Sequence, residues 1–247
     1  MTAVAKPKPS ARSAPTGPLD WRQLVEWLGQ DGMISTDEVK RTVARCSQAE
    51  SAQHPLVRLA AVAMERASDG KPLDIEALSQ WLAGRAGMDY LRIDPLKVDV
   101  GKVADMMSAA YAERHRVLPV QVTPLEVVVA TAEPFITDWV AEVERQSRRT
   151  VRRVITNPVD IHRYTAEFFA LAKSVRAAQK SGSGNGAASF EQLVELNKTN
   201  KQLDANDQGV VQIVDWLWTY AFDQRASDIH LEPRREQGVI RFRIDGV

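Results

Sequence analysis

Charged and apolar residues alternate in two short segments near the C-terminus, 228–232 and 239–244. The charged members occupy every second position: Asp228, His230 and Glu232 in the first segment, and Arg241 and Arg243 in the second. Because successive side chains of a β-strand point to opposite faces, each set shares one face of a strand. The intervening residues 233–238 are typical of a hairpin turn, so we expect the two charged faces to lie side by side.

Side by side, these residues offer two kinds of chemistry. Carboxylates opposite guanidinium groups form cross-strand ion pairs, and on a solvent-exposed face such pairs contribute little to stability. A guanidinium with further donors also binds phosphate oxygens in a bidentate manner. The pattern therefore fits either a solvated ladder of ion pairs or a contact to the phosphates of a nucleotide.

The element before the hairpin is predicted to be a helix over 210–222. Its apolar residues recur at helical spacing and are expected to share one face: Val211, Val214, Leu217 and Trp218. One helix and one two-stranded hairpin make a poor independent core. We therefore expect residues 208–247 to be the first, incomplete part of an α/β sheet module, with the chain ending inside a domain.

Residues 20–87 are predicted to form a small helical bundle. The helix starts are marked by capping residues or proline: Asp20, Ser35, Pro55 and Asp74. In the second helix we expect Val39 and Val43 to carry the buried face, and we expect the third helix to extend to Met64.

From residue 88 to 178 the pattern predicts a compact α/β accessory domain. The expected elements are an extended run at 90–93, a helix at 100–115, strands at 116–122, 126–130 and 150–156, and helices at 134–145 and 159–178. The nearly all-apolar strand at 126–130 is typical of a strand covered on both faces. Residues 179–207 have the composition of a flexible linker, and residues 1–19 that of a disordered tail. The fold class is therefore mixed α+β or α/β.

The composition gives no reason to expect a strongly charged partner. The 247 residues carry 32 Lys and Arg and 32 Asp and Glu, so the formal net charge is zero. This balance gives no argument for nucleic acid or an anionic membrane as a partner. The single cysteine, Cys46, fits a reducing cytoplasm and cannot form an internal disulfide. The four histidines show no metal-ligand spacing, so we expect no metal site.

Two motifs resemble the type II secretion and type IV pilus assembly ATPase family. Residues 226–233, Ala-Ser-Asp-Ile-His-Leu-Glu-Pro, and 241–246, Arg-Phe-Arg-Ile-Asp-Gly, are similar to the opening of the family's motor core. Upstream, Val-Leu-Pro at 117–119 and the apolar strand ending at Pro134 are similar to its N-terminal domain, with Glu133 where Asp is usual.

This resemblance implies a hexameric ATPase in which Arg241 and Arg243 contact nucleotide phosphates. Asp228, His230 and Glu232 would support the two arginines. ATP and Mg²⁺ would bind only in the intact protein, because no Gly-x-x-x-x-Gly-Lys-Ser/Thr loop is present and this chain alone should be inactive. The resemblance further implies a cytoplasmic protein that reaches the inner membrane through platform or docking partners.

Two alternatives remain for the front of the chain. Some relatives bind cyclic di-GMP through Arg-Leu-Gly motifs, and here the second of these reads Arg58-Leu59-Ala60 while the first has lost its arginine. Arg58 and Leu59 are therefore the candidate ligand contacts, set against amphipathic helices that simply pack a core. The other alternative is an adaptor with no motor attached.

Overall fold

The computed structural model describes residues 16–48, 51–181, 208–233 and 238–244. Residues 1–15 of the expected tail, most of the expected linker and the Asp-Gly pair at 245–246 lie outside these ranges. The predicted disorder was wrong at the end of the tail, because Leu19 is buried in the core and its N–H donates to the Glu133 carboxylate. The described chain divides into two compact units, Met1–Lys97 with Ala110–His162, and Val98–Ala109 with Arg163–Val247. No helix in these ranges combines the length and apolarity that crossing a membrane requires.

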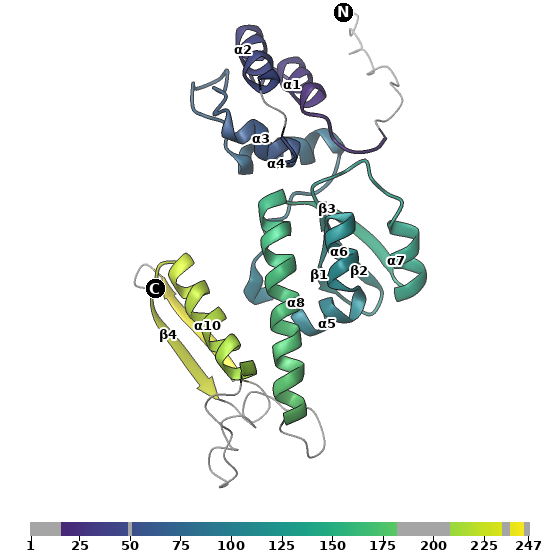
Figure 1. Ribbon diagram of the computed structural model, residues 1–247, viewed down its shortest axis with the longest axis vertical. Helices are drawn as coiled ribbons and strands as arrows, with labels where there is room; N and C mark the ends of the chain where they lie inside the picture. The colour runs from purple at the N-terminus through teal and green to yellow at the C-terminus, as the bar shows by residue number, and fades with distance from the viewer. Residues whose placement is uncertain (1–15, 49–50, 182–207, 234–237, 245–247) are drawn as a thin grey trace, which may run out of the picture. The chain divides into compact units, whose positions relative to one another are not determined.

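The front of the first unit is the predicted helical bundle (Figure 1). It consists of α1 (Trp21–Gln30), α2 (Thr36–Ser47), α3 (Pro55–Ala61) and α4 (Ile75–Ala86). The expected caps are confirmed, because the side chains of Asp20, Ser35 and Asp74 accept backbone N–H groups in the first turns of their helices. Leucines from α1, α3 and α4 fill the core between them.

The buried face of α2 differs from the prediction. Thr42 and Cys46 point into the protein, whereas Val43 is 37% exposed. Val39 packs against Gly29 of α1. A Cβ atom added to Gly29 would lie only 2.8 Å from Cγ2 of Val39. This close approach brings the start of α2 against α1 and leaves Val43, one turn further on, at the edge of the contact.

The third helix is shorter than predicted. It ends at Ala61, and Ala63 adopts a left-handed backbone conformation with φ of 52°. This turn sends Met64 into the core, where it is fully buried and its carbonyl accepts the Leu73 N–H at 2.8 Å. Met64 is therefore buried, as its helical spacing predicts, but a turn and not a longer helix brings it into the core.

The sheet of the first unit has the order β1-β2-β3. β1 (Val117–Val122) pairs antiparallel with β2 (Glu126–Thr131), and β2 pairs parallel with β3 (Thr150–Ile155). β2 is the central strand and is buried from its second residue onward, as its apolar run predicts. The extended run predicted at 90–93 lies along β3, with Tyr90 bridging Ile155.

Two helices depart from their predicted bounds. The expected helix at 100–115 is broken into α5 (Val100–Met106) and α6 (Ala109–His115), because Met107 is extended and buries its side chain. α7 (Val140–Ser147) begins later than the expected residue 134. The intervening turn buries Trp139, whose indole N–H donates to the Ile136 carbonyl. α8 (Pro158–Ser181) begins at the predicted proline and continues into the second unit.

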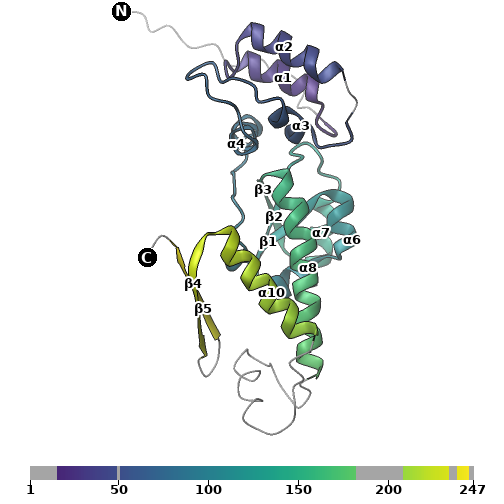
Figure 2. The same ribbon diagram turned by 60° about the vertical axis from the view of Figure 1, so that its left-hand side comes forward.

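The C-terminal part of the second unit is the predicted helix and hairpin (Figure 2). α10 (Gln208–Asp223) packs beside β4 (Ala226–Pro233), which pairs antiparallel with β5 (Gly238–Ile244). Leu217 and Ala221 of α10 are buried. Of the four residues predicted to share a face, only Leu217 is buried. Large apolar side chains of α10 are exposed: Val211, Val214, Trp218 and Phe222.

Candidate functional site: the cross-strand arginine pairs

The hairpin register places the two predicted charged sets directly opposite one another. Asp228 lies across from Arg243, and His230 lies across from Arg241. An irregularity in the pairing between Ala226 and Asp228 precedes this stretch, and from Asp228 on the strands pair residue by residue. The alternation that the sequence predicts therefore sets the charged residues on one face of the hairpin.

Each arginine is held by a carboxylate of the neighbouring strand. Arg243 Nη1 lies 3.2 Å from Asp228 Oδ2, and Arg241 Nη2 lies 3.1 Å from Glu232 Oε2. The second pair is diagonal, since Glu232 faces Val239 in the register. Ser227 donates its hydroxyl to the Asp228 carboxylate at 3.0 Å, which further fixes the acceptor for Arg243.

This charged face is open to solvent. The side chains of Arg241 and Arg243 are 59% and 51% exposed. On the opposite face Phe242 is half-buried, and its ring meets Tyr220 of α10 edge to face at 5.0 Å. The apolar side of the hairpin thus anchors it to α10, while the charged side is free to face another molecule or domain.

The arginine pairs can bind an anion. A guanidinium has five N–H donors, and each of these contacts engages one nitrogen. The carboxylates fix the orientation of the guanidinium groups without covering them, so phosphate oxygens can still approach. Arg241 and Arg243 occupy alternate positions of one strand, about 7 Å apart along the chain, a spacing that suits neighbouring phosphates.

The second candidate site, at the front of the chain, is a cavity of about 490 Å³. It is lined by Trp21, Ser51, Ala52 and Arg58. The guanidinium of Arg58 lies 4.8 Å from the centre of the Trp21 ring and donates to the carbonyl of Cys46. Arg58 therefore lines this cavity, and its role as a ligand contact stays a prediction.

Leu59, the predicted neighbour of Arg58 in that site, is fully buried in the hydrophobic core and does not line the cavity. Conversely, Arg22 was not predicted as a site residue, although its guanidinium lies 4.4 Å from the centre of the Trp21 ring. The contact of two guanidinium groups with one indole ring could be predicted only from the capped start of α1, because the cap fixes the direction of the Trp21 side chain.

Comparison with known proteins identifies the region. The MshEN domain family matches residues 86–175. The type IV pilus assembly ATPase TfpB of Acinetobacter baylyi is 37% identical over 233 residues, which is 93% of this chain and 40% of that protein. The type II secretion system protein E of Klebsiella pneumoniae is 27% identical over 151 residues, 58% of this chain and 29% of that protein.

A solved structure described as "Structure of MshE with cdg" aligns with 59% of this chain and 97% of that chain, at 15% identity and a TM-score of 0.42. The likeness at this score is too low to support an argument about a ligand.

The chain therefore contains an MshEN domain. The chain is similar to the type IV pilus assembly and type II secretion ATPases, and these matches support the N-terminal region of such a protein, as the motifs at 226–246 predict. It spans about two fifths of the length of the pilus ATPase that it matches.

Proposed function

We propose that this chain is the docking and regulatory front part of a hexameric ATPase that powers type IV pilus assembly or type II secretion. It would act in the cytoplasm and reach the inner membrane through platform proteins. The similarity to a pilus assembly ATPase over 93% of the chain supports this function. ATP hydrolysis with Mg²⁺ would need a further domain, because the chain has no phosphate-binding loop of its own.

The observation that carries the proposal is the shared face of Arg241 and Arg243. Each guanidinium is oriented by a carboxylate yet remains exposed. In the motor, a nucleotide held by a neighbouring domain would present its phosphates to this face. Positive charge placed where negative charge develops during phosphoryl transfer lowers the barrier to the reaction. Asp228 and Glu232 would position the arginines, and His230 would lie between them as a further polar group.

The uncovered apolar side of α10 also supports the proposal. Trp218 and Phe222 are 54% and 75% exposed, and apolar side chains grouped in this way are typical of surfaces that pack against another domain or protein. A neighbouring domain seated there would also be close to the hairpin, since α10 packs on β4.

The experiment is a pair of substitutions in the whole motor protein. Arg241→Ala and Arg243→Ala should each lower steady-state ATP hydrolysis by about tenfold or more while the hexamer remains assembled. Arg114→Ala, at an exposed arginine of α6, is the matched control. Full hydrolysis by both hairpin variants would overturn the nucleotide role. A gene that encodes no phosphate-binding loop after Val247 would instead favour the motor-less adaptor.

A second candidate function rests on the cavity beside Trp21. The Arg58 guanidinium that lines this cavity suits a phosphate group, which is one part of cyclic di-GMP. Calorimetry should then show binding that Arg58→Ala abolishes and Arg45→Ala, an arginine of α2 outside the cavity lining, retains. No heat at tens of micromolar cyclic di-GMP would eliminate this function.

A further inference from the structure

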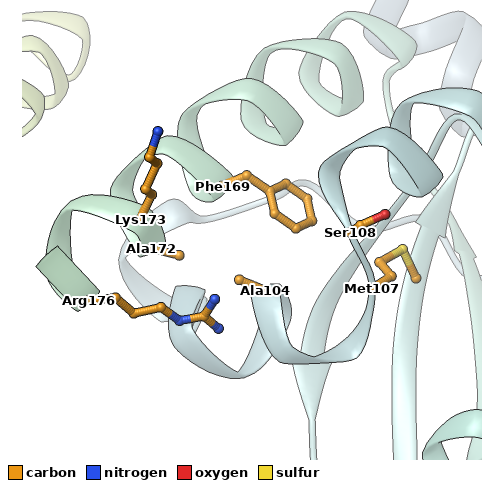
Figure 3. A pocket seen from close by; sticks show the side chains of 7 residues that line it. All are labelled: Ala104, Met107, Ser108, Phe169, Ala172, Lys173 and Arg176. Atoms are coloured by element: carbon orange, nitrogen blue, oxygen red, sulfur yellow. The ribbon is translucent and has the colours of Figure 1, made fainter.

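A groove of about 540 Å³ runs between α5 and α8 within the second unit (Figure 3). Its lining is mostly apolar: Ala104 and Met107 of the α5 side, and Phe169 and Ala172 of α8. Figure 3 shows the Phe169 ring directed across the groove toward the α5 side. Met107 and Ala172 are buried at its base, whereas Phe169 and Ala104 are partly exposed, so the aromatic ring is the surface that an apolar side chain can contact.

Two cations of α8 border this apolar surface. Lys173 and Arg176 are three residues apart and therefore adjacent on the helix. Arg176 pairs with Asp105 of α5, at 2.5 Å between Nη2 and Oδ1. No carboxylate among the described residues lies within ion-pair distance of Lys173, which is exposed. The border of the groove therefore carries one positive charge in excess.

We propose that this groove binds a short acidic segment of a partner protein, with one apolar side chain seated on Phe169 and a flanking carboxylate on Lys173. The inference rests on the docking role proposed above and names the surface and the chemistry of the partner. A peptide is favoured over a small ligand because the groove is open to solvent, whereas small-ligand sites enclose most of their ligand. The charge excess selects an acidic segment over a basic one.

The probe is a fluorescein-labelled peptide with the sequence Glu-Glu-Phe-Leu-Glu-Glu, titrated with the 247-residue chain and followed by anisotropy. Binding should weaken by about tenfold in Lys173→Glu and should be lost in Ala104→Trp, which fills the groove. Lys71→Glu, in the segment between α3 and α4, and Ala166→Trp on α8 are matched controls at exposed positions outside the lining, and both should bind like the parent chain. Added salt should weaken the interaction.

Three results would overturn the proposal. One is no binding of the peptide at about 1 mM protein. Another is equal binding by Ala104→Trp and Ala166→Trp. The third is equal binding of a peptide in which Ser-Ser replaces Phe-Leu. Phosphatidylglycerol vesicles form a separate arm, and vesicle binding that depends on Lys173 without peptide binding would assign the groove to a membrane surface. None of these results depends on ATP hydrolysis, so failure here leaves the motor role to its own test.

Discussion

His54 Nε2 lies 3.3 Å from Glu133 Oε1, and the two side chains are only 7% and 3% exposed. The other oxygen of Glu133 accepts the Leu19 N–H at 2.9 Å. His54 in turn caps α3, because its Nδ1 accepts the Leu56 N–H. One carboxylate, placed just after β2, therefore holds two separate points of the helical bundle against the sheet.

Removing this carboxylate should destabilise the first unit strongly. Glu133→Ala leaves the Leu19 N–H buried without its acceptor and removes the carboxylate beside His54, so we expect a loss of about 2 kcal/mol in the free energy of unfolding. Glu133→Gln should lose less, since its amide oxygen can still accept the Leu19 N–H. Urea unfolding measures both, with the exposed Glu113→Ala as control. If Glu133→Ala unfolded at the same urea concentration as the parent chain, this contact would not hold the bundle.

The role of Glu133 could not be predicted from the sequence. Its neighbours in sequence mark it only as the residue before a proline, at a position where the family usually has Asp. Its partners, His54 and Leu19, lie 79 and 114 positions earlier in the chain. Caps such as Asp20 and Ser35 depend on residues two or three positions away, which is why they were predicted correctly.

Tyr111 should make stability depend on alkaline pH. Burial, together with its hydrogen bond to Glu142 at 2.9 Å, raises the pKa of Tyr111 from 10 to about 12. The unfolded chain therefore loses this proton at a lower pH than the folded chain does. The contribution is fully present below pH 10 and is lost as the pH rises toward 12.

The measurement is the difference in unfolding free energy between the parent chain and Tyr111→Phe, taken from pH 8 upward. The difference should be about 1 kcal/mol near pH 8 and should shrink as the pH approaches 12. Taking the difference cancels the other titrating groups, which both chains share. Glu142→Gln tests the acceptor, because it keeps an oxygen for the Tyr111 hydroxyl and removes the charge. A difference that stays constant across this range would contradict the assignment.

Asp99 should stabilise α5 in a way that acid removes. Its carboxylate accepts the Lys102 N–H at 3.1 Å and lies 2.9 Å from Lys102 Nζ. Burial acts to raise the pKa of Asp99, but the hydrogen bonds and charge of Lys102 outweigh it, so the pKa is lowered. A lowered pKa means that the contribution is present above the ordinary pKa and lost as the pH falls through the folded value.

Two substitutions separate the cap from the charge. Asp99→Ala should cost about 1 kcal/mol at pH 7, whereas Asp99→Asn should cost less because asparagine also caps helices. The difference in unfolding free energy between the parent chain and Asp99→Asn should close as the pH falls below 3.8, the ordinary pKa of the carboxyl group. Hydrogen exchange of the α5 amides reads the effect locally. If the difference in unfolding free energy between the parent chain and Asp99→Asn increased in acid, the ionised carboxylate would not be the stabilising form.

The hairpin shows how far a sequence pattern reaches. Period-two alternation placed Asp228 and Arg243 on one face, and the register then brought them into contact at 3.2 Å. The α5–α8 groove could not be predicted in this way, because it depends on the break at Met107 inside an expected single helix. A local pattern fixes which face a residue occupies, whereas a cavity depends on how two distant segments meet.

Leu217 and Trp218 are consecutive in α10 but should respond oppositely to truncation. Leu217 is 4% exposed and lies on the side of α10 that faces the hairpin, whereas Trp218 is 54% exposed. Leu217→Ala should cost about 2 kcal/mol or more through the lost burial and the cavity left behind. Trp218→Ala in this chain should cost well under about 1 kcal/mol, because it removes little buried surface. Hydrogen exchange of the β4 and β5 amides distinguishes the two, since only the loss of Leu217 should reduce their protection.

In the whole motor, Trp218→Ala should also become destabilising if a further domain covers this face of α10. Equal protection of the β4 and β5 amides in the parent motor and the variant motor would mean that the face stays open.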